Sequence, residues 1–151
     1  MQSMTGYGRC QLTLEGREMT LEIKTVNHRF LDVSFRMPRN ISFLEETLRR
    51  ELAAKLRRGH ADVFVNYRNT RADARTVTVD TALVAAYEMA AEQVRQASGA
   101  SERLTVAELM NLPDVVQVTE AEEDREQVTA LAQAVLAKVL EEVQAMRARE
   151  G

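Results

Sequence analysis

An alternation of apolar and polar residues runs through Met19-Thr20-Leu21-Glu22-Ile23-Lys24-Thr25-Val26. Its period of two predicts a strand over residues 17–27 with one polar face. Glu15-Gly16-Arg17 is typical of a turn, so we expect this strand and residues 2–15 to form a hairpin around Gly16. The same alternation from Phe30 to Arg36 predicts a third strand.

A helix is predicted after the third strand. Ser42 and Glu45 have the spacing of a capping box, and Gly59 is expected to end the helix as a left-handed C-cap. An apolar stripe at every fourth position can be buried against the sheet: Leu44, Leu48, Leu52 and Leu56. Cations near the end either complement the helix dipole or form a basic cluster beside the sheet edge: Lys55, Arg57 and Arg58.

The chain then alternates again over residues 62–69 and 76–79, which predicts two further strands. Asp80 is expected to cap a helix that stops at Ser98-Gly99. Its expected buried face consists of Leu83, Tyr87, Ala90 and Val94. Thr105 and Glu108 are expected to cap a short helix.

From about Glu120 a long final helix is predicted. Its apolar stripe consists of Leu131, Val135, Val139 and Val143, broadened by Val128, Leu136, Leu140 and Met146. Such a stripe needs a partner surface. It can pack on its own sheet, or it can meet a missing part of the protein or a neighbouring subunit.

This order of elements predicts an α+β fold: a mainly antiparallel sheet with helices packed on one face, plus a long C-terminal helix. The order is also similar to that of the ribosomal S5 domain 2-like fold. We expect an α+β domain over residues 1–118 and a helix over residues 119–151 that leads toward a further domain.

Composition excludes several classes of protein. Apolar residues make up 45% of the chain but form no run long enough for a membrane span, and no signal peptide is evident. Cys10 is the single cysteine, which suits a reducing cytoplasm. The net charge is −3, with the basic residues concentrated in the first half and the acidic residues in the second. This asymmetry fits a basic working surface, or simply Glu-rich solvent faces on the later helices.

The polar junction Val26-Asn27-His28-Arg29-Phe30-Leu31-Asp32 joins two predicted strands. A junction places side chains at the edge of a sheet, where a ligand can reach them. Amide and guanidinium groups donate in geometries that suit phosphates and base edges. Arg29 also has a structural interpretation, a salt bridge with Asp32.

No Walker motif or dinucleotide loop is present, so we expect no nucleotide cofactor. Gly6-Tyr7-Gly8 is expected to allow a bulge or a close backbone approach. No Cys/His cluster has zinc spacing, and we expect the acidic run of residues 120–126 to be solvated first turns of the last helix. Tyr7 and Phe30 can stack on bases, although we favour packing roles for both.

Three segments together resemble the YicC/YloC family of bacterial proteins, in particular its N-terminal domain: Ser3-Met4-Thr5-Gly6-Tyr7-Gly8, Val26 to Asp32, and Arg57-Arg58-Gly59-His60 before a strand. Arg36-Met37-Pro38 and Leu109 to Val115 also match. The family pattern usually has Lys where this chain has His60. The resemblance covers essentially all 151 residues, but only about the first half of a typical member.

The resemblance implies an endoribonuclease that acts as a homo-oligomer with a divalent metal cation, whose ligands we expect in the C-terminal half. This chain is then the RNA-binding and oligomerisation part, without a complete active site and with catalytic residues unknown. We expect RNA contacts from Asn27, Arg29, Arg36, Arg58 and His60, which form a cationic sheet end if the third and fourth strands are neighbours.

Two alternatives remain open. His28 and His60 can act as an acid–base pair in a metal-free ribonuclease. Alternatively, the chain is a non-catalytic protein–protein assembly module in which the same signature residues hold subunits together.

Overall fold

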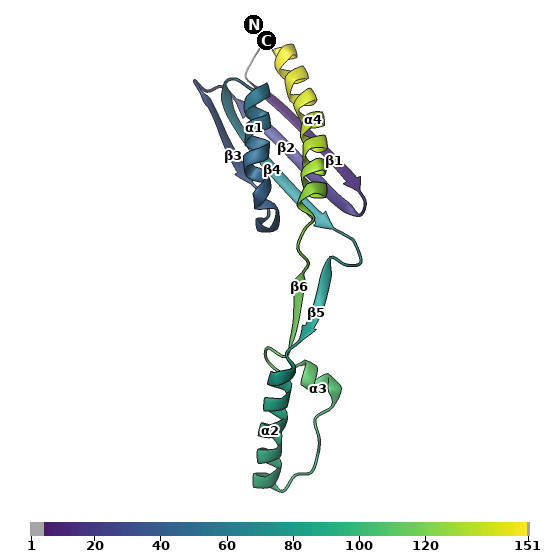
Figure 1. The fold of residues 1–151 in the computed structure, drawn as a ribbon. Helices are drawn as coiled ribbons and strands as arrows, with labels where there is room; N and C mark the ends of the chain where they lie inside the picture. The colour runs from purple at the N-terminus through teal and green to yellow at the C-terminus, as the bar shows by residue number, and fades with distance from the viewer. Residues whose placement is uncertain (1–4, 151) are drawn as a thin grey trace. The chain divides into compact units, whose positions relative to one another are not determined.

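The computed structural model describes residues 5–150 and divides the chain into two compact units (Figure 1). The first, here called the sheet unit, contains the chain up to Arg71 and again from Glu122. The second, the insert unit, is Ala72–Ala121. The boundary expected at residue 118 falls inside a strand of the insert unit, and the continuation into a further domain stays a prediction.

Four strands form the sheet of the sheet unit, in the order β1-β2-β4-β3. They are β1 (Gly6–Leu14), β2 (Arg17–Val26), β3 (Leu31–Arg36) and β4 (Gly59–Asn69). β1 pairs with β2, and β2 with β4, in antiparallel fashion, whereas β3 runs parallel to β4. The parallel pair follows from the helical crossover between β3 and β4. The prediction of an α+β fold with a mainly antiparallel sheet is confirmed.

The predicted hairpin is confirmed, because β1 and β2 are joined by Glu15 and Gly16, which have φ values of 50° and 78°. Two-residue hairpin loops require such positive φ angles. Ser3 and Met4 of the N-terminal signature lie outside the described residues.

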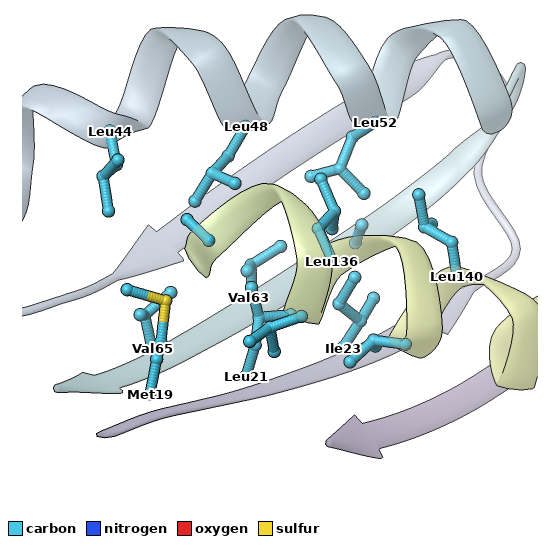
Figure 2. Packing of buried hydrophobic residues seen from close by; sticks show 14 of the residues in the cluster. Met19, Leu21, Ile23, Leu44, Leu48, Leu52, Val63, Val65, Leu136 and Leu140 are labelled. Carbon is cyan, nitrogen blue, oxygen red and sulfur yellow. The ribbon is translucent and has the colours of Figure 1, made fainter. Parts of the chain in front are cut away.

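One face of the sheet is covered by α1 (Glu45–Lys55) and α4 (Arg125–Glu150), as Figure 2 shows. Every predicted member of both apolar stripes is buried except Met146, which is half-buried. They pack on alternate strand residues, among them Leu21, Ile23 and Val63. The long stripe of α4 therefore packs on its own sheet, and burial of this face supplies the main stabilising term of the unit.

The glycines of β1 allow α4 to approach its backbone. A Cβ atom added at Gly8 would lie 2.6 Å from the carbonyl oxygen of Val139, and one at Gly6 would lie 3.0 Å from Val143. The predicted close backbone approach is confirmed. The Glu142 carboxylate also accepts a hydrogen bond of 2.9 Å from the Arg9 backbone N–H.

Both predicted ends of the first helix are wrong. A 3₁₀ turn, Arg39–Leu44, precedes α1, so the helix begins after Leu44 and no side chain caps it. The helix stops at Lys55 because Leu56 turns into an extended conformation and enters the core. Gly59 does have a positive φ of 116°, but as the first residue of β4.

The insert unit contains β5 (Arg75–Val79), α2 (Thr81–Ser98), α3 (Val106–Met110) and β6 (Val116–Glu120). β5 and β6 form a separate antiparallel pair. The caps predicted at Asp80 and Gly99 are confirmed, as is the capping box of Thr105 and Glu108.

The insert unit differs from the sequence analysis in two respects. Strand β6 was not predicted, because residues 116–120 are few and stand directly before the acidic run that we assigned to the last helix. The predicted buried face of α2 is wrong: Leu83 and Tyr87 are half-buried, and Ala90 and Val94 are exposed. Across the described part of the chain, every helix is too short or too polar to cross a membrane.

Candidate nucleic-acid interface

Polar residues from two segments meet at one end of the four-stranded sheet. The loop between β2 and β3 follows Val26, which pairs with His60, and precedes Leu31, which pairs with Gly59. The register therefore places this loop beside the start of β4. We call the following residues the sheet-end cluster: Asn27, His28, Arg29, Phe30, Arg58 and His60.

Four of the five predicted RNA-binding residues belong to this cluster, and Arg36 does not. Arg36 ends β3 opposite Phe64, about 16 Å along the strand from Leu31. Its guanidinium carbon lies 5.7 Å from the centre of the Phe64 ring, and the Lys24 ammonium lies 5.8 Å from the same ring. Arg36 therefore belongs to the face of the sheet opposite the helices.

The guanidinium groups of Arg29 and Arg58 are exposed. Among the side chains that the structure describes, no carboxylate lies within ion-pair distance of either group. The salt bridge considered between Arg29 and Asp32 is absent, because Asp32 contacts His60 instead. Unpaired guanidinium groups leave their donors available to an anionic ligand.

A side chain of α4 contacts the backbone of Arg58. Arg147 lies four residues after Val143, is buried, and donates a hydrogen bond of 3.1 Å to the Arg58 carbonyl oxygen. Burial lowers the pKa of the Arg147 guanidinium. We missed this contact in the sequence, although a cation that continues an i+4 apolar stripe is a signal for a buried role.

His60 bridges two carboxylates. Its Nδ1 lies 2.8 Å from Asp32 Oδ2 on β3, and its Nε2 lies 3.0 Å from Asp62 Oδ1 on β4. These hydrogen bonds raise the pKa of His60, and the bond to Asp32 has the larger effect. Only the imidazolium can donate to both carboxylates at once, because the neutral ring carries a single N–H.

His28 lies beside His60, with ring centres 6.5 Å apart. It is exposed, and its Nδ1 lies 3.0 Å from the Phe30 carbonyl oxygen. The fold thus brings together the two imidazoles considered as an acid–base pair. Proton donation by His60 would first require the loss of one of its two carboxylate contacts, so this arrangement favours charge placement over proton transfer.

Phe30 is 67% exposed, so the core or half-buried packing that we favoured for it is wrong. Tyr7 is 40% exposed, so it is not a core residue but more than half of it is covered. The Arg29 guanidinium carbon lies 5.6 Å from the centre of the Phe30 ring. The alternation contained a signal for this exposure, since Phe30 has the same parity as Asp32 and Ser34, which are both exposed. An exposed aromatic ring beside cations can stack on a nucleic-acid base.

The described residues do not fit a divalent cation. Asp32 and Asp62 lie on opposite nitrogens of the His60 ring, so their oxygens do not converge. Within residues 5–150, no group of three His, Cys, Asp or Glu side chains is arranged to hold a metal ion. In the acidic run, Glu123 instead accepts hydrogen bonds from Tyr67, at 2.7 Å, and from Asn69. The metal site expected in the C-terminal half stays a prediction.

Comparison with known proteins gives a match over the whole chain. Residues 1–151 match the family model described as "Endoribonuclease YicC-like, N-terminal region". Two curated relatives are named "Probable endoribonuclease YicC": one from Clostridioides difficile, 27% identical over 149 residues, and one from Haemophilus influenzae, 26% identical over 152 residues. Each alignment covers 99% of this chain and 51% of the relative, so the chain spans about half the length of these relatives.

Proposed function

Since the chain belongs to the YicC-like endoribonuclease family as its N-terminal region, we propose that it binds the RNA substrate of such an enzyme through the sheet-end cluster. The observation that carries this proposal is the position of Arg29 and Arg58. The two guanidinium groups stand at one sheet end, exposed and without carboxylate partners among the described side chains.

The chemistry of the cluster fits RNA. Arg29 and Arg58 can each bind a phosphate with charge-assisted hydrogen bonds, and the Asn27 amide can donate to a phosphate or a base edge. The exposed ring of Phe30 offers a surface for an unpaired base. Binding through phosphates is expected to be salt-dependent and largely indifferent to sequence.

In this proposal, hydrolysis of the phosphodiester bond belongs to the whole protein. The divalent cation implied by the family would be held by residues of the C-terminal half, as the donor set of the described residues does not fit one. We expect the protein to act in the cytoplasm.

The test is RNA binding by the 151-residue chain, measured by fluorescence anisotropy with a short labelled oligouridylate. Arg29→Ala with Arg58→Ala should weaken binding by about tenfold or more. It should also reduce the slope of log binding constant against log salt concentration by about one to two. The matched control is Arg39→Ala with Arg50→Ala, which removes the same charge from exposed positions outside the cluster. Equal affinity of the two double variants would reject the proposal.

A second function, assembly of several copies of the chain, is favoured by the insert unit. Helix α2 has no buried residue, and Met89, Val94 and Val106 are 67%, 63% and 72% exposed. Val77 and Val118 on β5 and β6 are each 63% exposed. Exposed apolar residues gathered in one small unit are typical of an interaction surface.

The assembly proposal predicts that the 151-residue chain associates in solution and that Met89→Lys with Val94→Lys reduces this association. Ala134→Lys with Ala137→Lys places two lysines at exposed positions of α4, in the sheet unit, and serves as the control. Sedimentation velocity is the measurement. A monomer at all concentrations would contradict assembly through this unit.

A further inference from the structure

We propose that RNA binding at the sheet-end cluster is coupled to the protonation of His60, so that the site binds RNA more weakly as the pH rises. This inference rests on the proposed function, because it concerns the regulation of the same site. It assigns His60 the role of a positioning residue, which acts on RNA through the charges around it.

The geometry joins three side chains on two neighbouring strands. Asp32 on β3 and His60 on β4 are register partners, and Asp62 lies two residues further along β4 on the same face. The imidazole stands between the two carboxylates, with contacts of 2.8 and 3.0 Å. The His60 side chain is 27% exposed, and the Asp32 and Asp62 side chains are 57% and 47% exposed, so solvent reaches all three.

The other elements around His60 contribute few competing charges. On β2, uncharged Val26 is the register partner of His60, and Lys24 is the partner of Asp62. Lys24 is paired with Glu22 at 3.6 Å. From the loop between β2 and β3, His28 lies 6.5 Å away, measured between ring centres.

The charge state of His60 decides what an approaching phosphate meets. The imidazolium donates to both carboxylates and adds one positive charge to the sheet end that carries Arg29 and Arg58. The neutral ring has one N–H only, so it can donate to just one carboxylate, and the other faces a nitrogen lone pair. Two carboxylates then oppose the two guanidinium groups, and a phosphate gains less from binding.

The two carboxylates also determine the pH range in which His60 loses its proton. They raise the pKa of His60 above its ordinary value, so the imidazolium persists to higher pH than in a free histidine. If RNA prefers the charged ring, RNA binding must raise the pKa of His60 further, by linkage.

The experiment measures the dissociation constant of a labelled oligouridylate from about pH 6 to about pH 9 at constant ionic strength, a range that brackets histidine titration. For the unchanged chain, we expect the dissociation constant to rise by about three- to tenfold across this range. His60→Lys carries a permanent cation and should bind tightly throughout. His60→Gln should bind weakly throughout, whereas His28→Gln, the matched control, should keep the pH dependence.

A second measurement does not depend on the folding of variants. The His60 ring protons of the unchanged chain are followed by NMR against pH, with and without the same oligouridylate. A rise in the pKa of His60 on RNA binding supports the coupling, and an unchanged pKa overturns it.

The outcomes separate the inference from the function on which it rests. RNA binding that is independent of pH, or a pH dependence that disappears in His28→Gln, overturns the coupling to His60 and leaves the RNA-binding site standing. Absence of RNA binding at every pH overturns both.

Discussion

At the scale of the residue, His60 ties β3 to β4 by contacts to Asp32 and Asp62. Because these contacts favour the protonated ring, they link the stability of the sheet end to pH. The folded chain has a raised His60 pKa, whereas the unfolded chain has the ordinary value of about 6.5. The stabilisation is therefore complete below that value and is lost as the pH rises through the raised pKa.

We expect the thermal unfolding temperature to fall over this window of pH. Asp32→Asn removes the charge of the closer of the two carboxylates and should make the fall shallower, whereas Asp114→Asn in the insert unit should leave it unchanged. Thermal unfolding followed by circular dichroism at several pH values is the measurement. An unchanged pH dependence in Asp32→Asn would show that this contact does not contribute.

At the scale of the element, buried polar contacts join the N-terminal end of α4 and the residues just before it to strands β2 and β4. The Arg17 guanidinium on β2 lies 3.7 Å from the Glu123 carboxylate, with side chains 9% and 8% exposed. Arg17 also donates to Gln127, and Tyr67 on β4 donates to Glu123. Burial and the Glu123 carboxylate raise the pKa of the Tyr67 hydroxyl, which therefore stays a hydrogen-bond donor.

Glu123→Gln should destabilise the sheet unit by about 3 kcal/mol, because it leaves the Arg17 guanidinium buried without its anion. Glu126→Gln changes an exposed carboxylate in the next turn and should have little effect. Urea unfolding measures the free energy of unfolding of both variants. Equal stability of the two variants would indicate that the Arg17–Glu123 contact is not stabilising.

The elements also show what sequence periodicity can predict. The alternation of β2 and the i+4 stripes of α1 and α4 predicted the core because each element buries one face, and burial enforces the period. The ends of α1 were not predictable from capping patterns, because packing of Leu56 and a preceding 3₁₀ turn overrode the local signals of Ser42 and Gly59. Strand β6 has no buried face and spans 5 residues, so its alternation of apolar and polar residues was too short to predict a strand.

At the scale of the whole molecule, the candidate site depends on a pairing that periodicity does not contain. The polar junction of residues 26–32 was evident in the sequence, but only the parallel pairing of β3 with β4 brings Arg58 and His60 to it. The same register places Arg36 far along β3. The hydrogen bond from Arg147 to the Arg58 carbonyl oxygen joins residues 89 positions apart, so no local sequence pattern predicts it.

The chain spans about half the length of its curated relatives, and its described carboxylates do not converge on a metal site. We therefore predict that the 151-residue chain binds RNA but cleaves it slowly or not at all with magnesium or manganese. Gel analysis of labelled RNA, with and without EDTA, tests this prediction. Efficient metal-dependent cleavage by the purified chain would place the active site within these residues.

Mapping RNA contacts residue by residue tests the proposed site most directly. Backbone amide NMR spectra of the 151-residue chain would be recorded during titration with a short oligouridylate. We predict that the largest shifts fall on residues 27–30 and 58–60, with little change in α2 or around Arg50. Large shifts confined to the insert unit or to α1, with the sheet end unmoved, would contradict RNA binding at this cluster.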